Sequence, residues 1–154
     1  NENMFSTIQY VYDRSDKVVV LVLKYIHLMI HNYMKSDVFA CLSRLFYTVN
    51  QLLTGPLLFD RKKEMAFEIS TICLKIQADV FELVEKEGGS SLLRKYNYDF
   101  ITVWSVLYQR LSREDFTCDE IKENYKQLKM LDGDVDKIAE ELCLARPELK
   151  PLFN

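Results

Sequence analysis

The chain has 154 residues, of which 49% are hydrophobic and 12% aromatic. This length and composition suit one domain with a continuous core and exclude an intrinsically disordered chain. The net charge is −3, with 20 basic and 23 acidic residues spread along the sequence, which argues against a broad nucleic-acid or membrane surface. With only four glycines and three prolines, turns are few and elements are long, so helices are favoured over short strands.

Residues 1–14 fit either a strand or a helix, and we favour a helix or an extended lead-in. The first clear helix is predicted at 16–34, with Ser15 as its N-cap. Its apolar residues leave almost no polar face, so we expect it to be buried on most sides. It is shorter than the roughly 20 apolar residues of a bilayer span, and Lys24 interrupts it, so it is not expected to cross a membrane.

Five further helices follow the 3.6-residue apolar period. The longest, 60–86, is the one against which the others are expected to pack. Lys35-Ser36-Asp37 is interpreted as a tight connection, and Ser90 or Ser91 starts a short extra turn of helix. The five predicted helices span residues 37–53, 60–86, 99–112, 118–131 and 135–145, and residues 147–151 are expected to form one last turn.

Helix ends are marked by characteristic residues. Gly55 and then Pro56 end the second helix, with Gly55 expected in the left-handed conformation. Gly88-Gly89 ends the longest helix, and Gly133 ends the helix at 118–131. Thr117 and Glu120 match a capping box, in which each side chain accepts from the other's backbone amide.

These patterns predict an all-α fold of about six helices, arranged as antiparallel helical hairpins. The pairs 16–34 with 37–53, 60–86 with 99–112, and 118–131 with 134–145 resemble a short, degenerate stack of HEAT or armadillo type, and a compact helical bundle is the alternative. No Gly/Ser-rich linker divides them, so residues 1–154 are predicted to form a single domain. Because the chain begins at Asn1, we expect it to be a fragment of a larger protein.

The histidines and cysteines offer little catalytic chemistry. His27 and His31 are four residues apart on one helix, a spacing that can bind zinc, but Leu28 stands where HExxH needs its glutamate and no third ligand is evident nearby. We therefore predict no metal and no cofactor.

Four cysteines are present, at positions 41, 73, 118 and 143. They form no CxxC pair and no signal peptide is visible, so we predict reduced thiols and an intracellular protein, cytoplasmic or nuclear. Cys118 is expected at N1 of a helix, where the helix dipole lowers a thiol pKa. No histidine is expected near it, so we interpret it as a partly exposed thiol open to oxidation.

The sequence contains no complete calcium-binding or phosphate-binding motif. The segment LDGDVD at 131–136 only partly matches an EF-hand loop, because its glycine follows Asp132 directly. No glycine-rich phosphate-binding loop is present.

Two basic clusters are the predicted partner-binding residues: Arg61, Lys62 and Lys63, and Arg94, Lys95 and Tyr96. Positive charge in the first turn of the long helix opposes the helix dipole, and such locally unfavourable choices can mark functional surfaces. Both clusters suit an acidic partner or a phosphate, and ordinary solvated loops are the alternative interpretation.

The sequence therefore predicts a non-catalytic interaction module, an adaptor or scaffold that binds a helix or peptide of another protein in a groove between helices. Three alternatives remain. They are a helical regulator resembling Bcl-2 proteins, a homodimerisation domain, and a weak nucleic-acid-binding module that uses the basic clusters.

Overall fold

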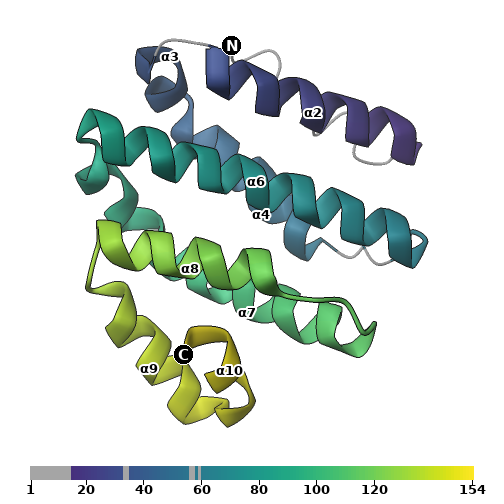
Figure 1. The fold of residues 1–154 in the computed structure, drawn as a ribbon, viewed down its shortest axis with the longest axis vertical. Coiled ribbons are helices and arrows are strands. Elements are labelled where there is room, and N and C mark those ends of the chain that lie inside the picture. The colour runs from purple at the N-terminus through teal and green to yellow at the C-terminus, as the bar shows by residue number, and fades with distance from the viewer. Residues whose placement is uncertain (1–14, 33–34, 56–57, 59) are drawn as a thin grey trace. The chain divides into compact units, whose positions relative to one another are not determined.

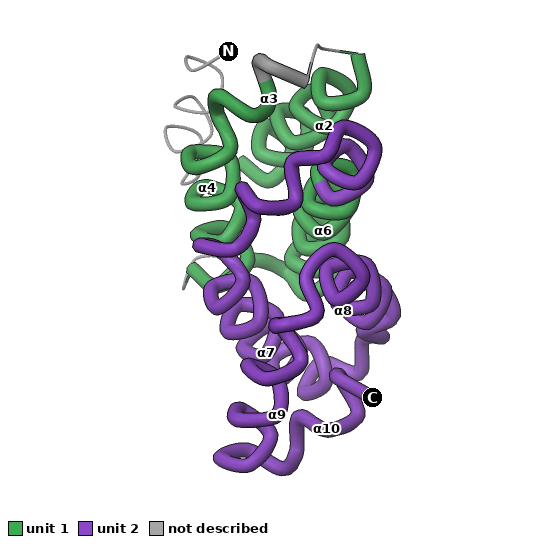
Figure 2. Tube along the Cα trace, turned by 90° about the vertical axis from the view of Figure 1, so that its left-hand side faces the viewer, with its two compact units in different colours: residues 1–80 green, residues 81–154 purple. Residues whose placement is uncertain are grey.

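The computed structural model describes residues 15–32, 35–55, 58 and 60–154. All regular elements in these ranges are helical, which confirms the all-α class (Figure 1). The chain divides into two compact units, unit 1 with residues 1–80 and unit 2 with residues 81–154 (Figure 2). The expectations for residues 1–14 and for Pro56 lie outside the described residues, and the single domain stays a prediction.

Unit 1 contains α2 (Asp16–Asn32), α3 (Lys35–Ala40), α4 (Leu42–Thr54) and most of α6 (Lys63–Glu87), which continues into unit 2. Lys35-Ser36-Asp37 is helical, so its prediction as a tight connection is wrong. The single helix predicted at 37–53 is instead broken at Cys41. There the amide of Cys41 donates to the carbonyl of Val38, three residues back, in a tighter turn than the α-helix allows.

Polar contacts show that α2 and α6 run in the same direction. Asp16, at the start of α2, pairs with Arg61 just before α6. Lys24 meets Glu68, and His27 meets Asp79 further along both helices. The partners advance together, so the two helices are parallel and α3 and α4 carry the chain back between them. The core of unit 1 is formed by buried residues that include Leu23, Ile26, Leu45, Phe46, Val49, Leu53, Ile69, Cys73 and Ile76.

Unit 2 contains the C-terminal elements. They are the 3₁₀ helix η1 (Ser90–Tyr96), α7 (Asn97–Arg113), α8 (Asp119–Leu131), α9 (Val135–Ala145), η2 (Pro147–Leu149) and α10 (Lys150–Phe153). Within the described ranges the chain thus forms eight α-helices and two 3₁₀ helices, and the predicted number of about six is not confirmed. The difference arises from the α3–α4 break and from α10.

An aromatic cluster forms the centre of unit 2. Phe81, Phe100 and Trp104 are fully buried. Phe100 stacks on Trp104 with ring centroids 5.6 Å apart, and Phe81 meets Phe100 edge to face at 5.2 Å. Nearby, the buried side chain of Asn97 donates to Asp132 Oδ2 at 2.6 Å, which fixes the start of α7 against the end of α8.

The predictions for three helix termini can be compared with the structure. Gly88 follows α6 with φ of +75°, the left-handed conformation that glycine accepts without strain. Gly55 ends α4 but is extended, with φ −64° and ψ 147°, so the left-handed prediction is wrong there. The capping box is also wrong, because the N-cap of α8 is Cys118 and no side chain caps it.

None of the described helices is both long enough and apolar enough to pass through a lipid bilayer.

The buried aromatic cluster predicts a contrast between two substitutions on α7. Trp104→Ala should lower the free energy of unfolding by about 3–5 kcal/mol, because it leaves a large cavity in the core. Tyr98→Ala removes a side chain that is 67% exposed and should cost less than about 0.5 kcal/mol. Chemical denaturation of both variants measures the difference, and equal losses would contradict the described packing.

Candidate functional site

A row of apolar side chains on α2 faces solvent. Val18, Leu21, Tyr25 and Leu28 are 38%, 65%, 56% and 59% exposed. Their spacing of three, four and three residues places them along one line of the helix. We call these four residues the α2 stripe. The opposite face of α2 is buried through Val19, Val20, Leu23, Ile26, Met29 and Ile30. The prediction that this helix is buried on most sides is therefore wrong: it has one buried apolar face and one exposed apolar face.

Basic residues accompany the α2 stripe on one side. Lys17 and Lys24 each precede a stripe residue by one position, and both are exposed. Lys24 Nζ lies 4.0 Å from Glu68 Oε1, a solvent-exposed pair that contributes little to stability.

The first predicted basic cluster lies beside the start of α2. Arg61 is largely buried and engaged by Asp16, so it serves packing within unit 1. Lys62 and Lys63 are exposed. Since α6 begins at Lys63, Arg61 and Lys62 precede the helix, and the predicted conflict with the helix dipole applies to Lys63 alone.

The second predicted cluster belongs to unit 2. Arg94, Lys95 and Tyr96 form the last turn of η1. Lys95 Nζ lies 5.0 Å from the centre of the Tyr96 ring, within reach of a cation–π interaction. Arg94 and Lys95 are exposed, whereas Tyr96 is partly buried.

The structure supplies the third residue that the sequence did not reveal beside the histidines. His27 and His31 on α2 both direct Nε2 at one carboxylate oxygen of α6, Asp79 Oδ2, at 2.6 and 3.0 Å. The two rings meet edge to face with centroids 5.1 Å apart. Asp79 lies about 50 positions away in sequence, so spacing alone could not find it. The available signal was a lone carboxylate between Ala78 and Val80 in the packed middle of α6.

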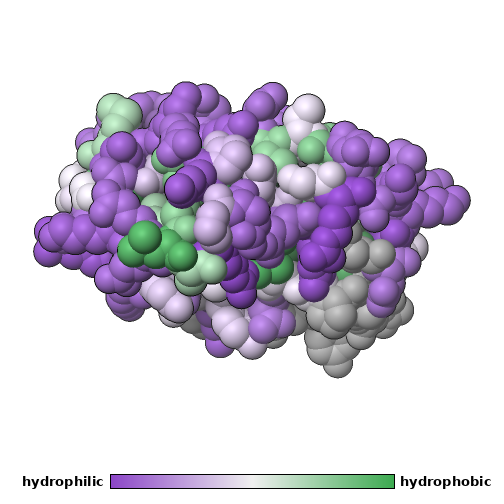
Figure 3. Space-filling view, turned by 90° about the horizontal axis from the view of Figure 1, so that it is seen from below, coloured by the Kyte–Doolittle hydropathy of each residue, from purple (hydrophilic) through white to green (hydrophobic). Residues whose placement is uncertain are grey.

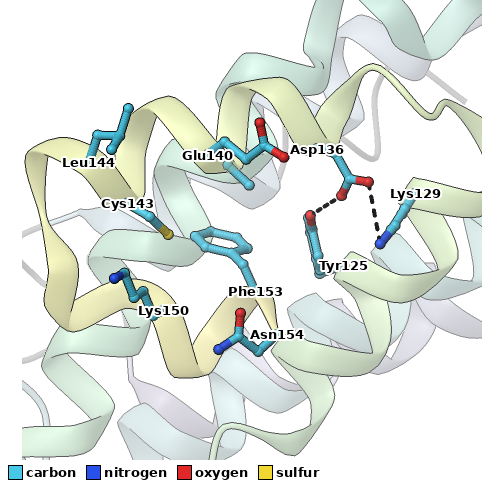
Figure 4. A pocket seen from close by; sticks show the side chains of 10 residues that line it. Tyr125, Lys129, Asp136, Glu140, Cys143, Leu144, Lys150, Phe153 and Asn154 are labelled. Atoms are coloured by element: carbon cyan, nitrogen blue, oxygen red, sulfur yellow. Dashed lines mark hydrogen bonds and ion pairs between the residues drawn. The ribbon is translucent and has the colours of Figure 1, made fainter.

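Unit 2 contains an open cavity of about 500 Å³ between α8, α9 and α10 (Figure 4). Tyr125 donates its hydroxyl to Asp136 Oδ1 at 2.5 Å, and Lys129 Nζ lies 3.3 Å from the other oxygen of that carboxylate. The ring of Phe153 packs against Tyr125 with centroids 4.8 Å apart. Cys143 and Lys150 line the remaining wall.

Two potential nucleophiles in this cavity, the Cys143 thiol and the Tyr125 hydroxyl, have raised pKa values. Burial raises the pKa of the Cys143 thiol, and Lys150 offsets only part of that effect. Burial and the hydrogen bond to Asp136 raise the pKa of Tyr125. Both groups therefore stay protonated at neutral pH. The two histidines of the chain are both in α2, so unit 2 has no imidazole base for either group.

Cys118 differs from its prediction. It is the N-cap of α8 rather than N1 and is buried. Burial raises its pKa, an effect larger than the lowering by the Ser112 hydroxyl and by Lys122. The expected lowered thiol pKa and partial exposure are therefore both wrong.

Other exposed apolar side chains in unit 2 include Met130 and Leu144, which are 81% and 85% exposed. The face drawn in Figure 3 is mainly hydrophilic, with hydrophobic residues in small groups. Isolated apolar residues are normal on protein surfaces. The α2 stripe is distinguished from them by its regular spacing on one helix.

Comparison with known proteins gives no match among family models, curated proteins or solved structures.

The thiol environments predict an order of alkylation. At pH 8 Cys143 should react first because it is the only partly exposed cysteine of the four, and the fully buried Cys73 should react last. Because the pKa values of Cys118 and Cys143 are raised, their thiolate fractions at pH 8 are below that of an unfolded cysteine, and their rates should keep rising at higher pH. Mass spectrometry of iodoacetamide-treated protein checks the order, with the urea-unfolded chain as control. Early labelling of Cys118 would contradict it.

Proposed function

We propose that this protein is a non-catalytic interaction module in which the α2 stripe binds an amphipathic helix of a partner protein. The observation that supports this most directly is the row of four exposed apolar side chains at coiled-coil spacing. Exposing a regular apolar row costs solubility, so such a surface is typical of an interaction site.

The spacing of the stripe fits a helical partner. Side chains three and four residues apart on a facing helix interdigitate with such a row. Burial of a leucine-sized side chain contributes about 1.5–3 kcal/mol. Leu21 and Leu28 are the most exposed residues of the stripe and are expected to contribute most of the binding energy. Tyr25 lies between them as an aromatic anchor.

The charges around the stripe favour an acidic partner. Lys17 and Lys24 line one side, and Lys62 and Lys63 lie next to the first turn of α2 through the Arg61–Asp16 pair. Carboxylates on the flank of the partner helix would meet these lysines, which steers association and sets orientation.

Arg94, Lys95 and Tyr96 of unit 2 remain a second proposed contact, for acidic groups of a partner. Their exposed cations and the adjacent aromatic ring provide charge and a stacking surface.

A second copy of the chain fits the stripe less well. In an antiparallel pair the flanks with Lys17 and Lys24 would face each other and repel. In a parallel pair they would face positions held by Val22 and Met29, which offer no carboxylate. Nucleic acid would match the lysines but leave the apolar row in water.

The proposal also covers how the helices pair and where in the cell the protein acts. The helices are proposed to pair as antiparallel hairpins, either in a short stack resembling HEAT or armadillo repeats or in a compact bundle. A helical regulator resembling Bcl-2 proteins, which also binds a partner helix, is the second architecture in keeping with this function. The proposed setting is an adaptor subunit of a larger complex in the cytoplasm or nucleus.

Selection from a peptide display library tests the proposal. Each peptide carries leucine at helical i, i+3, i+7 and i+10 positions, with the flanking positions randomised among Glu, Lys and Ser. Peptides with glutamate flanks should be enriched on the wild-type protein. Leu21→Asp/Leu28→Asp should weaken their binding at least tenfold in fluorescence anisotropy, whereas Tyr47→Ala, an exposed residue of α4 in the same unit, should not.

Three outcomes would reject this function. The first is no enrichment over the Leu21→Asp/Leu28→Asp protein, and the second is binding that Tyr47→Ala weakens equally. The third is a dimer in sedimentation equilibrium that Leu21→Asp/Leu28→Asp dissociates, which would assign the stripe to a second copy instead.

A further inference from the structure

His27, His31 and Asp79 bring three metal-binding side chains from two helices to one point. Their donor atoms, His27 Nε2, His31 Nε2 and a carboxylate oxygen of Asp79, all lie within 4.8 Å of one another. The two histidines are one helical turn apart, so their rings project from the same face of α2. The parallel pairing of α2 and α6 brings Asp79 opposite that turn.

We propose that this trio is a binding site for a divalent transition-metal ion, with Zn²⁺ the best fit. Two imidazole nitrogens and one carboxylate oxygen are a donor set that zinc takes in proteins. Hard cations such as Mg²⁺ and Ca²⁺ prefer donor sets made of oxygen alone, so they are not the ions expected at this site. Cu²⁺, Ni²⁺ and Co²⁺ also accept imidazole, and geometry together with availability decides among them.

The distances fit a metal after a small adjustment. Tetrahedral zinc holds its donors about 2.0–2.1 Å away, which separates neighbouring donors by roughly 3.3 Å. The histidine nitrogens now lie 2.6 and 3.0 Å from Asp79 Oδ2. To reach that separation the His27 nitrogen must withdraw by about 0.7 Å and the His31 nitrogen by about 0.3 Å, changes within reach of rotation about the side-chain bonds. Both rings then carry their proton on Nδ1 and present the lone pair of Nε2 to the ion.

The three side chains differ in their exposure to solvent. Asp79 is 15% exposed, His27 30% and His31 52%. The carboxylate is thus sheltered in the helix interface, while His31 leaves a path to solvent. Three protein ligands leave the fourth tetrahedral position for water or for a donor atom of a binding partner.

A bound ion would fasten α2 to α6. It would hold the middle and the end of α2, while the Asp16–Arg61 pair holds its start. This inference is independent of the proposed partner helix, since the stripe lies on a different face of α2.

The competing explanation is a pair of histidines that only donate hydrogen bonds to Asp79. Glutamine separates the two cases, because its amide can donate to the carboxylate but is a poor zinc ligand. The test variants are therefore His27→Gln, His31→Gln and Asp79→Asn. The controls are Glu68→Gln, which removes an exposed carboxylate elsewhere on α6, and Cys143→Ser, which removes the most exposed thiol.

Isothermal titration of the chelator-treated full chain with ZnCl₂ measures stoichiometry and affinity. We expect one ion per chain with a Kd of about 1 μM or below, at least tenfold weaker binding in each of the three test variants, and no change in the two controls. CoCl₂ should give a tetrahedral d–d spectrum without the intense thiolate-to-cobalt absorption.

Thermal unfolding provides a readout that does not depend on the intrinsic stability of a variant. Saturating ZnCl₂ should raise the Tm of the wild type by mass action and raise the Tm of His31→Gln by less, each relative to its own metal-free sample. Absence of saturable one-to-one binding would overturn the proposal. Binding that the glutamine variants retain and Cys143→Ser loses would do the same, because it assigns the ion to a thiol.

Discussion

The parallel pairing of α2 with α6 is the constraint on which both surfaces of interest depend. Three polar contacts mark the register along the whole of α2, from Asp16–Arg61 through the exposed Lys24–Glu68 pair to the histidines with Asp79. With that register fixed, Leu23 and Ile26 enter the core. The α2 stripe then points outward and the two imidazoles meet a carboxylate. A shift of α2 by one residue along α6 would rotate all three faces together.

Helix α2 is unusual because apolar residues occupy its exposed positions as well as its buried ones. Amphipathic helices place charge on the side that water reaches. In α2 both the core side and much of the solvent side are apolar, and the polar residues Lys24, His27 and His31 lie between them. The buried face is filled by packing within unit 1. The exposed face has no such partner among the described residues, and this asymmetry distinguishes it from α4, α7 and α8.

Sequence patterns predicted the all-α class and several of the helix ranges, because apolar period and glycine position act locally. The range 135–145 matches α9, and Gly88 follows the end of α6 at the predicted position. Features that depend on contacts across the fold were missed. Neither the exposure of Leu21 nor the position of Asp79 beside His31 follows from neighbours in the chain, because both are set by how α2 lies on α6. The thiol of Cys118 illustrates the same point, since burial outweighs the helix terminus that the sequence shows.

The order in which unit 1 can fold also follows from the parallel pairing. Each α2 contact with α6 joins residues 44 or more positions apart, as His27 and Asp79 do, so closing it requires a long loop of chain. During synthesis α2 emerges before α3, α4 and most of α6, and its inner face is covered only after these helices have been made. For that interval both apolar faces of α2 are accessible at once. Nascent chains of this protein are therefore candidates for chaperone binding at α2, and release would be timed by the synthesis of α6.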